Sequence, residues 1–257
     1  MTIDVAEEHR MIIDLVEKFV DNELMPLERA VMEREASGEP VSLIKEEEVT
    51  LLAKCKELGL WALDAPEPLG GAELPTTVML AIQERLRRTV TPFIFPPDSP
   101  NLHMLMDVAT SEQKEKYLRP YAQGEMKSCI AISEPGAGGD PAQMRTRAVR
   151  EGNEWVINGR KIWVSNVPSA DFTILMAVTD PDKGARGGIT AFVVDKGTAG
   201  FNVEREIPML GGARTYELAI EDLHLKDSQV LGEVGQGFAP MQKRLTERRL
   251  EMGAMCV

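Results

Sequence analysis

Apolar residues recur every three or four positions through about the first 125 residues, which is the spacing of one face of an α-helix. Helical stretches are indicated by four sets of such positions: Val5, His9, Ile12, Val16, Phe19 and Val20; Leu51, Leu52, Cys55 and Leu58; Met79, Ile82 and Leu86; and Tyr117, Leu118 and Tyr121. The first part of the chain is therefore predicted to be helical.

Local signals indicate where these helices begin and end. Two pairs have the spacing of a capping box, Asp4 with Glu7 and Thr110 with Gln113. Gly59 and Gly124 follow apolar stripes and suit the left-handed residue that ends a helix. Three prolines between residues 92 and 97 predict a loop, because proline lacks a donor and has a fixed φ.

From Cys129 the apolar period changes to two, the period of a strand. Short β-branched and apolar runs cover residues 129–132, 155–157, 162–164, 172–175, 189–194 and 218–220. Asn158 and Gly159 stand between two of these runs and favour a type I′ hairpin turn, since both central positions of that turn need φ > 0. After about residue 235 helix formers return, from Met241 to Met255.

This order predicts an α+β protein with several domains. We expect an all-α domain over 1–125, an antiparallel β-barrel or sandwich over 126–234, and the beginning of a C-terminal helical bundle over 235–257. The sequence stops at Val257 in the middle of a predicted helix without a cap, which favours a fragment of a longer protein.

Composition and charge indicate which partners, metal sites and cellular locations to expect. Lys+Arg 29 against Asp+Glu 41 gives a formal net charge of −12, with no basic stripe, so nucleic acid is not expected as a partner. The three cysteines are far apart and predict neither a disulfide framework nor a metal site. No apolar window approaches the ~18 residues of a membrane span and no signal peptide precedes the first helix, so we expect a cytoplasmic protein.

Candidate chemistry gathers in two segments. The first, 132–140, reads Ile-Ser-Glu-Pro-Gly-Ala-Gly-Gly-Asp; its glycines let backbone N–H groups approach an anionic ligand, although a ligand-free turn would have the same composition. The second, 161–166, places the Trp163 indole and the Ser165 hydroxyl two positions apart on one face of a strand. That pair suits a flat heteroaromatic ligand, whereas most strand tryptophans are core residues.

Together these segments resemble the acyl-CoA dehydrogenase family. The first is similar to that family's hydrophobic-Thr/Ser-Glu-Pro-x-Ala-Gly-Ser-Asp signature, and residues 158–166, Asn-Gly-Arg-Lys-Ile-Trp-Val-Ser-Asn, are similar to Asn-Gly-x-Lys-x-Trp-Ile/Val-Thr/Ser-Asn. Further similar segments are 66–71, 110–114, 221–223, 231–233 and 235–238, so the resemblance covers the whole chain in order.

The resemblance implies that the protein binds FAD and dehydrogenates an acyl-CoA at Cα and Cβ, passing a hydride to flavin N5. The cofactor-binding positions that it implies are Ile130, Ile132, Ser133, Gly138, Gly139, Trp163, Val164 and Ser165. Of these, Gly138 and Gly139 correspond to the pyrophosphate contact, Trp163 flanks the ring and Ser165 lies near N5. Gly139 replaces the family's loop serine and, with Arg249, is the implied substrate contact.

The same resemblance assigns no catalytic base within this sequence. In most of the family the base is a glutamate beyond the position of Val257, and in a minority it lies at the position of Arg248. Glu247 and Glu251 are not in register with that position, because one residue turns a helix by about 100°.

Partners implied by the resemblance are an acyl-CoA substrate, an electron-transferring flavoprotein, and further copies of the chain in a homodimer or homotetramer formed through the C-terminal domain. Two other interpretations stay open. One is a flavin monooxygenase or oxidase on the same fold, and the other is a catalytically silent partner subunit that assembles with a complete dehydrogenase.

Overall fold

A computed structural model describes residues 6–39, 41–210 and 212–256, which fold into two compact units. The first unit takes in residues 1–100, 210–213 and 245–257, and the second takes in 101–209 and 214–244. The predicted α+β class is confirmed, with a helical part followed by a sheet. The domain boundaries at 125/126 and 234/235 stay predictions.

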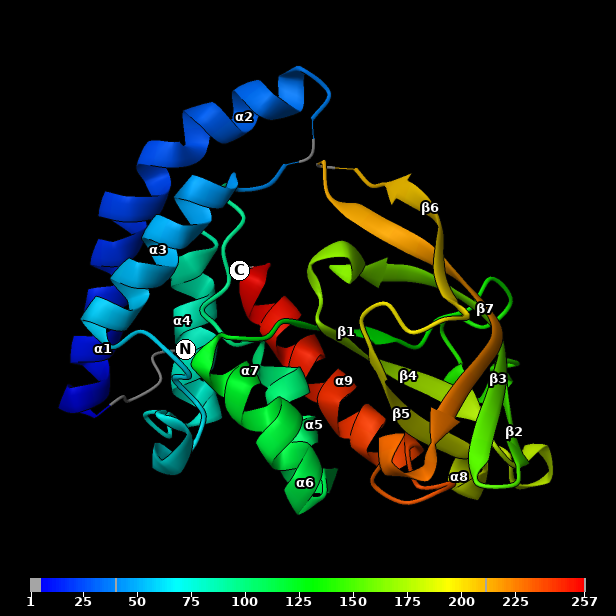
Figure 1. Ribbon diagram of the computed structural model, residues 1–257. Coiled ribbons are helices and arrows are strands. Elements are labelled where there is room, and N and C mark those ends of the chain that lie inside the picture. The colour runs from blue at the N-terminus through cyan, green and yellow to red at the C-terminus, as the bar shows by residue number, and fades with distance from the viewer. Residues whose placement is uncertain (1–5, 40, 211, 257) are drawn as a thin grey trace. The chain divides into compact units, whose positions relative to one another are not determined.

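The first unit is helical. Its elements are α1 (Glu7–Phe19), the π-helical turn η1 (Val20–Leu24), η2 (Met25–Leu27), α2 (Glu28–Ala36), α3 (Lys45–Leu58), η3 (Glu67–Leu69), α4 (Thr76–Leu86) and the later residues of α9 (Phe238–Met255). Helices α1, α3 and α4 lie side by side and share one apolar core (Figure 1). At its centre the rings of Phe19, Phe93 and Phe95 pack with centroids 5.4 to 5.6 Å apart.

Of the two helix ends predicted in this unit, the one at Gly59 is confirmed. Helix α3 ends at Gly59, whose φ of 69° is left-handed as expected of a glycine cap. The predicted loop over 92–97 carries no helix or strand. The proposed Asp4 cap lies outside the described residues. The sequence pattern missed α2, because only Val31 of that helix is buried and no apolar stripe marks it.

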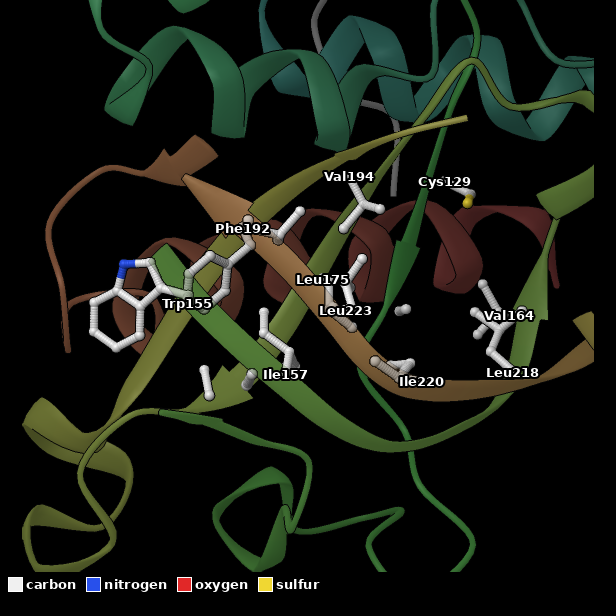
Figure 2. Packing of buried hydrophobic residues seen from close by; sticks show 14 of the residues in the cluster. Cys129, Trp155, Ile157, Val164, Leu175, Phe192, Val194, Leu218, Ile220 and Leu223 are labelled. Carbon is white, nitrogen blue, oxygen red and sulfur yellow. The ribbon is translucent and has the colours of Figure 1, made fainter. Parts of the chain in front are cut away.

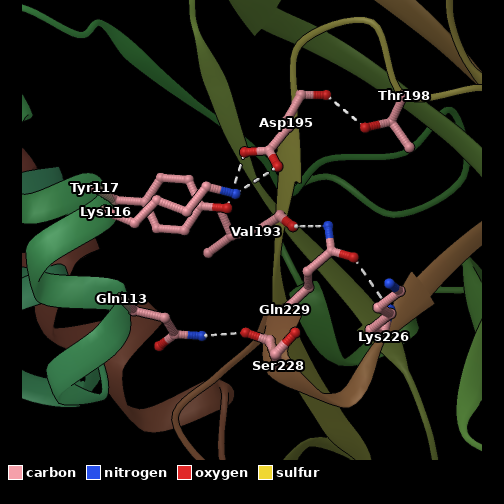
Figure 3. Close-up of polar contacts among 9 residues, drawn as sticks. All are labelled: Gln113, Lys116, Tyr117, Val193, Asp195, Thr198, Lys226, Ser228 and Gln229. Carbon is pink, nitrogen blue, oxygen red and sulfur yellow. Dashed lines mark hydrogen bonds and ion pairs between the residues drawn. The ribbon is translucent and has the colours of Figure 1, made fainter.

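The second unit begins with short helices that attach to its sheet. They are α5 (Ser99–Val108), which begins in the first unit, α6 (Ser111–Gln113), η4 (Lys114–Leu118) and α7 (Arg119–Gln123). The predicted Thr110 and Gln113 capping box is present. The Gln113 amide also donates to Ser228 O at 3.0 Å, and Lys116 reaches Asp195 at 2.8 Å (Figure 3).

The sheet of the second unit has eight strands. They are β1 (Ser128–Ala131), β2 (Arg147–Glu151), β3 (Glu154–Ser165), β4 (Phe172–Val178), β5 (Ile189–Asp195), β6 (Phe201–Pro208), β7 (Arg214–Lys226) and β8 (Val230–Leu231). Short helical turns connect them: η5 (Pro141–Gln143), η6 (Val167–Ser169), η7 (Pro181–Lys183), α8 (Ala185–Gly188) and η8 (Asp227–Gln229).

The strand order is β6-β7-β3-β2-β4-β5-β8, with β1 paired to β4. Most neighbours are antiparallel as predicted, but β1 runs parallel to β4 and β2 meets β4 in parallel, so the sheet is mixed. The reason is that the chain leaves the sheet after β1 through the glycine-rich loop and returns elsewhere, rather than turning back as a hairpin. The sheet core packs Trp155 against Phe192, with ring centroids 5.7 Å apart (Figure 2).

The predicted hairpin at Asn158 and Gly159 is wrong. These residues lie inside the single strand β3, and the turn between β2 and β3 is at residues 152–153, where Gly152 has φ 63°. The pairing of β3 with β7 shifts between Ile157 and Gly159, and the extra residue lies on β7, between Leu223 and Ile220, so a bulge of β7 faces this part of β3. A Cβ at Gly159 would come within 2.6 Å of Thr146 Cα, and the glycine therefore permits close contact between backbones.

Candidate functional site

The loop between β1 and β2 is folded into a tight turn with an open outer surface. Backbone N–H groups of Glu134 and Ala137 each donate to the other residue's carbonyl, at 3.0 and 3.1 Å. A Cβ built at Gly136, Gly138 or Gly139 meets nothing within 4 Å, so packing inside this chain does not require glycine there. The space beside these backbone atoms is open to a ligand.

The sequence-predicted residues Ile130, Ile132 and Ser133 lie at the start of this loop. All three are partly exposed, whereas Cys129 and Ala131, which alternate with them, are buried. The strand thus keeps one face in the core and presents its other face beside the loop.

Trp163 lies in a strained and exposed position. Its φ is 62°, which is rare for an aromatic residue, and its side chain is 52% exposed. The pairing of β3 with β7 passes from Lys161 opposite Leu218 to Val164 opposite Tyr216, so one extra residue bulges from β3. A bulge re-aims a side chain, and retained strain of this kind is typical of functional sites.

Of the three residues that follow Trp163, two are exposed and one is buried in the sheet core. Ser165 is exposed, as the alternation with Trp163 predicts, and Asn166 takes a left-handed φ of 64°. The Val164 side chain is buried in the sheet core (Figure 2), so only its backbone is available to a ligand.

A buried ion pair holds the loop against the bulged strand. Lys161 is 0% exposed, and its Nζ lies 2.8 Å from Glu134 Oε1 and donates to Ile132 O at 3.0 Å. The Ile162 N–H, inside the bulge, donates to Ser133 O at 2.9 Å. Two separate contacts therefore fix the loop relative to Trp163.

The Glu134 carboxylate is also held by the returning chain. Its two oxygens accept from the backbone N–H groups of Arg145 and Thr146, at 2.6 and 2.9 Å. Burial alone would raise the pKa of Glu134, but Lys161 and these donors outweigh burial and lower it. Burial lowers the pKa of Lys161 to about 8, against the opposing effect of Glu134.

Sequence reasoning missed the roles of Glu134 and Lys161. Both stand within the two segments that carry the candidate chemistry: Glu134 lies between Ser133 and Pro135, and Lys161 directly precedes the apolar run 162–164. A single acid and a single base that fall where a sheet core is expected are a signal for a buried pair, because an unpaired charge there is costly.

Arg249, the predicted substrate contact, belongs to the first unit, unlike the loop and the bulge, which belong to the second. It is exposed on α9. Its neighbour Arg248 pairs with Glu251 at 2.8 Å and with Asp98.

The second unit thus combines an open glycine-rich turn, an exposed indole and an exposed hydroxyl. These groups fit a ligand with a flat ring system and an anionic portion, since backbone N–H groups in such turns bind anions and an indole stacks on a ring. Among the described ranges, no group of three or more His, Cys, Asp and Glu side chains is arranged to hold a metal ion. No helix within those ranges is both long and apolar enough to cross a membrane.

Two family models match the chain, and both describe domains of the same family. Residues 6–125 match the family model of the acyl-CoA dehydrogenase N-terminal domain, and residues 129–227 match that of the acyl-CoA dehydrogenase middle domain.

Similar proteins are also found among curated sequences and solved structures. The chain is 37% identical to the (R)-benzylsuccinyl-CoA dehydrogenase of Thauera aromatica, with all of this chain and 65% of that protein covered. A solved structure from Mycobacterium abscessus, assigned to the acyl-CoA dehydrogenases, has a TM-score of 0.88 and 30% identity, covering 98% of this chain and 67% of the other. The butyryl-CoA dehydrogenase structure from Megasphaera elsdenii has a TM-score of 0.82 and 26% identity, covering 99% and 66%.

The chain spans 65% of the length of the Thauera protein. Within that span both family domains match in order, and the fold agrees with solved members. The chain therefore belongs to the acyl-CoA dehydrogenase family.

Proposed function

We propose that this chain forms the flavin-binding part of an FAD-dependent acyl-CoA dehydrogenase that oxidises an acyl-CoA thioester at Cα and Cβ. The observation that carries the proposal is the strained, exposed Trp163 fixed beside an open glycine-rich turn. When bound, FAD supplies a hydride acceptor at N5.

The residues of the site have separate binding tasks. The indole of Trp163 covers one part of the flavin ring, while Ile130 and Ile132 present their partly exposed side chains to it. The hydroxyls of Ser133 and Ser165 donate hydrogen bonds to ring heteroatoms. Such donors favour the reduced, more negative ring, because preorganised dipoles stabilise developing charge.

The anionic portion of FAD is assigned to the turn. Gly138 and Gly139 leave backbone atoms accessible, and in this proposal their N–H groups face the pyrophosphate. Gly139 and Arg249 are the proposed contacts to the acyl-CoA. The Glu134 and Lys161 pair acts as a positioning pair, since it ties the turn to the strand that carries Trp163.

Electron-transferring flavoprotein is the proposed electron acceptor, and the complete protein is proposed to assemble as a homodimer or homotetramer. We place it in the cytoplasm, where its three free thiols, Cys55, Cys129 and Cys256, are stable in reduced form.

A glycine series tests the cofactor assignment. Gly138→Ala and Gly139→Ala add a methyl group that meets no atom of the chain within 4 Å, so both variants should unfold at the wild-type temperature. We expect Gly138→Ala to weaken FAD binding by about tenfold or more, measured by quenching of flavin fluorescence, and Gly139→Ala to have a smaller effect, because the family signature carries a serine at that position. Gly136→Ala, in the same turn and equally open, is the matched control and should bind FAD as wild type does. Equal FAD affinity in all three variants would contradict the assignment.

A further inference from the structure

The backbone of Ile132 and Ser133 is fixed by two hydrogen bonds at the start of the glycine-rich turn. The Ile132 carbonyl accepts from Lys161 Nζ at 3.0 Å, and the Ser133 carbonyl accepts from the Ile162 N–H at 2.9 Å. Within the part of the chain that the structure describes, neither the N–H nor the hydroxyl of Ser133 has a hydrogen-bond partner. All four residues belong to the second unit.

The direction of the Ser133 N–H follows from the bond that holds the Ile132 carbonyl. Both atoms belong to one trans peptide group, which directs its C=O and its N–H to opposite sides. Because the Ile132 oxygen points to the buried Lys161, the Ser133 N–H points away from it. Ser133 is partly exposed, so a ligand can reach this donor.

Lys161 brings a positive charge into contact with this peptide group. Its side chain is 0% exposed, and its Nζ lies 2.8 Å from Glu134 Oε1 as well as 3.0 Å from the Ile132 oxygen. At longer range the carboxylate cancels much of the field of the ammonium. At the direct contact the bond is charge-assisted and about twice as strong as a neutral one, and hydrogen bonds in series polarise one another. The contact therefore makes the Ser133 N–H more polar.

We propose that Lys161 is a positioning residue that acts on the flavin ring through the Ile132–Ser133 peptide group: its ammonium strengthens the Ser133 N–H as a donor and so favours the reduced, more negative ring. The inference rests on the proposed function and extends it, because Lys161 then sets the reduction potential of FAD in addition to holding the turn. A donor that is already fixed in place stabilises developing charge without reorganising.

The reduction potential of FAD bound to the supplemented full chain tests the proposal, measured by dye equilibration at about pH 6.5. Lys161 is charged there, since its folded pKa is about 8. Lys161→Met/Glu134→Gln removes the ammonium without leaving a buried charge unpaired. We expect this double variant to bind reduced FAD about tenfold more weakly relative to oxidised FAD, which lowers the potential of this two-electron couple by about 30 mV.

Two results would overturn the proposal in this experiment. If the double variant binds oxidised and reduced FAD equally more weakly, its potential is unchanged and the pair only positions the turn, while the proposed function stands. Lys161→Arg keeps a cation and should retain most of the wild-type potential. A fall in Lys161→Arg as large as that in the double variant would show that the charge is not responsible.

Lys116→Met/Asp195→Asn is the matched control. Lys116 and Asp195 form another ion pair of the second unit, also 2.8 Å long, and neither is a hydrogen-bond partner of Ile132 or Ser133 among the described residues. This variant should have the wild-type potential. The same fall in this variant as in the Lys161 double variant would make the effect a general one and would overturn the proposal.

NMR of the FAD-free wild type tests the inference even if a variant does not fold. The Lys161 Cε signal reports the loss of the Lys161 proton as the pH rises, while Glu134, which faces Lys161, stays ionised because its pKa is lowered. We expect the Ser133 amide proton to move upfield with the same midpoint. A Ser133 signal that does not move as Lys161 titrates would overturn the inference. If the signal follows Lys161 but wild type binds no FAD, the proposed function fails while the polarised peptide group stands.

Discussion

Lys161 Nζ lies 2.8 Å from Glu134 Oε1, and both side chains are buried. One member of the pair comes from the loop after β1 and the other from the bulged part of β3. The contact therefore connects the two segments that the proposed cofactor needs at a fixed separation.

Removing one member of this pair should lower the free energy of unfolding much more than replacing both members. Lys161→Met leaves the Glu134 carboxylate buried without its cation, and we expect a loss of about 3–5 kcal/mol in the free energy of unfolding. The double variant Lys161→Met/Glu134→Gln should recover part of this loss, because it leaves no unpaired buried charge, although the single amide oxygen can accept from only one of the N–H groups of Arg145 and Thr146. Urea unfolding of the two single variants and the double variant measures the coupling; additive losses would contradict it.

The same pair should give the stability a defined pH dependence. The folded pKa of Lys161, about 8, is below its ordinary value of 10.5, so between these values the unfolded chain binds more protons and this group's contribution to stability rises with pH. The pKa of Glu134 is lowered on folding, so its contribution is present above 4.5 and is lost as the pH falls through the folded pKa.

The contribution of Lys161 is measured as the difference in unfolding free energy between wild type and Lys161→Met from pH 7 to 10.5. It should grow by at most about 1.4 kcal/mol per pH unit. A difference that shrinks across this range would mean that Lys161 has a raised pKa in the folded protein.

Trp163→Gly should separate stability from cofactor binding. Glycine accepts a φ of 62° without strain, so we expect the free energy of unfolding to be unchanged or higher by up to about 1 kcal/mol. FAD affinity should fall, because the exposed indole is the proposed ring contact. Asn166→Gly removes a side chain at a similar φ of 64° and serves as the control for backbone effects; an equal loss of FAD affinity in both variants would argue against the indole.

Gly159→Ala should destabilise the sheet. The added Cβ would lie 2.5 to 2.7 Å from Thr146 atoms, including its backbone Cα, and β3 or the returning chain would have to shift. We expect a loss of about 1–3 kcal/mol, the range for overpacking, measured by thermal or urea unfolding. Gly152→Ala is the comparison variant: Gly152 has a left-handed φ of 63°, but a Cβ there would meet no atom within 4 Å. Its loss of stability therefore measures the effect of backbone conformation without steric contact.

Much of the helical part could be predicted from the sequence because its signals are local. The Thr110 and Gln113 capping box and the Gly59 terminator need only residues within one turn, and both are confirmed. The β region was recognised by its period, but Asn158 and Gly159 are compatible with both a hairpin turn and a continuous strand. Pairing with β7, some sixty residues later in the chain, selected the strand.

The sequence by itself determined the order of helical and β segments and the position of the glycine-rich loop, because each depends on residues close in the chain. Only the tertiary structure decided that Lys161 is buried against Glu134. The physical reason is that the cost of a charge depends on what surrounds it. Those surroundings come from segments far apart in sequence, whose contacts no local pattern encodes.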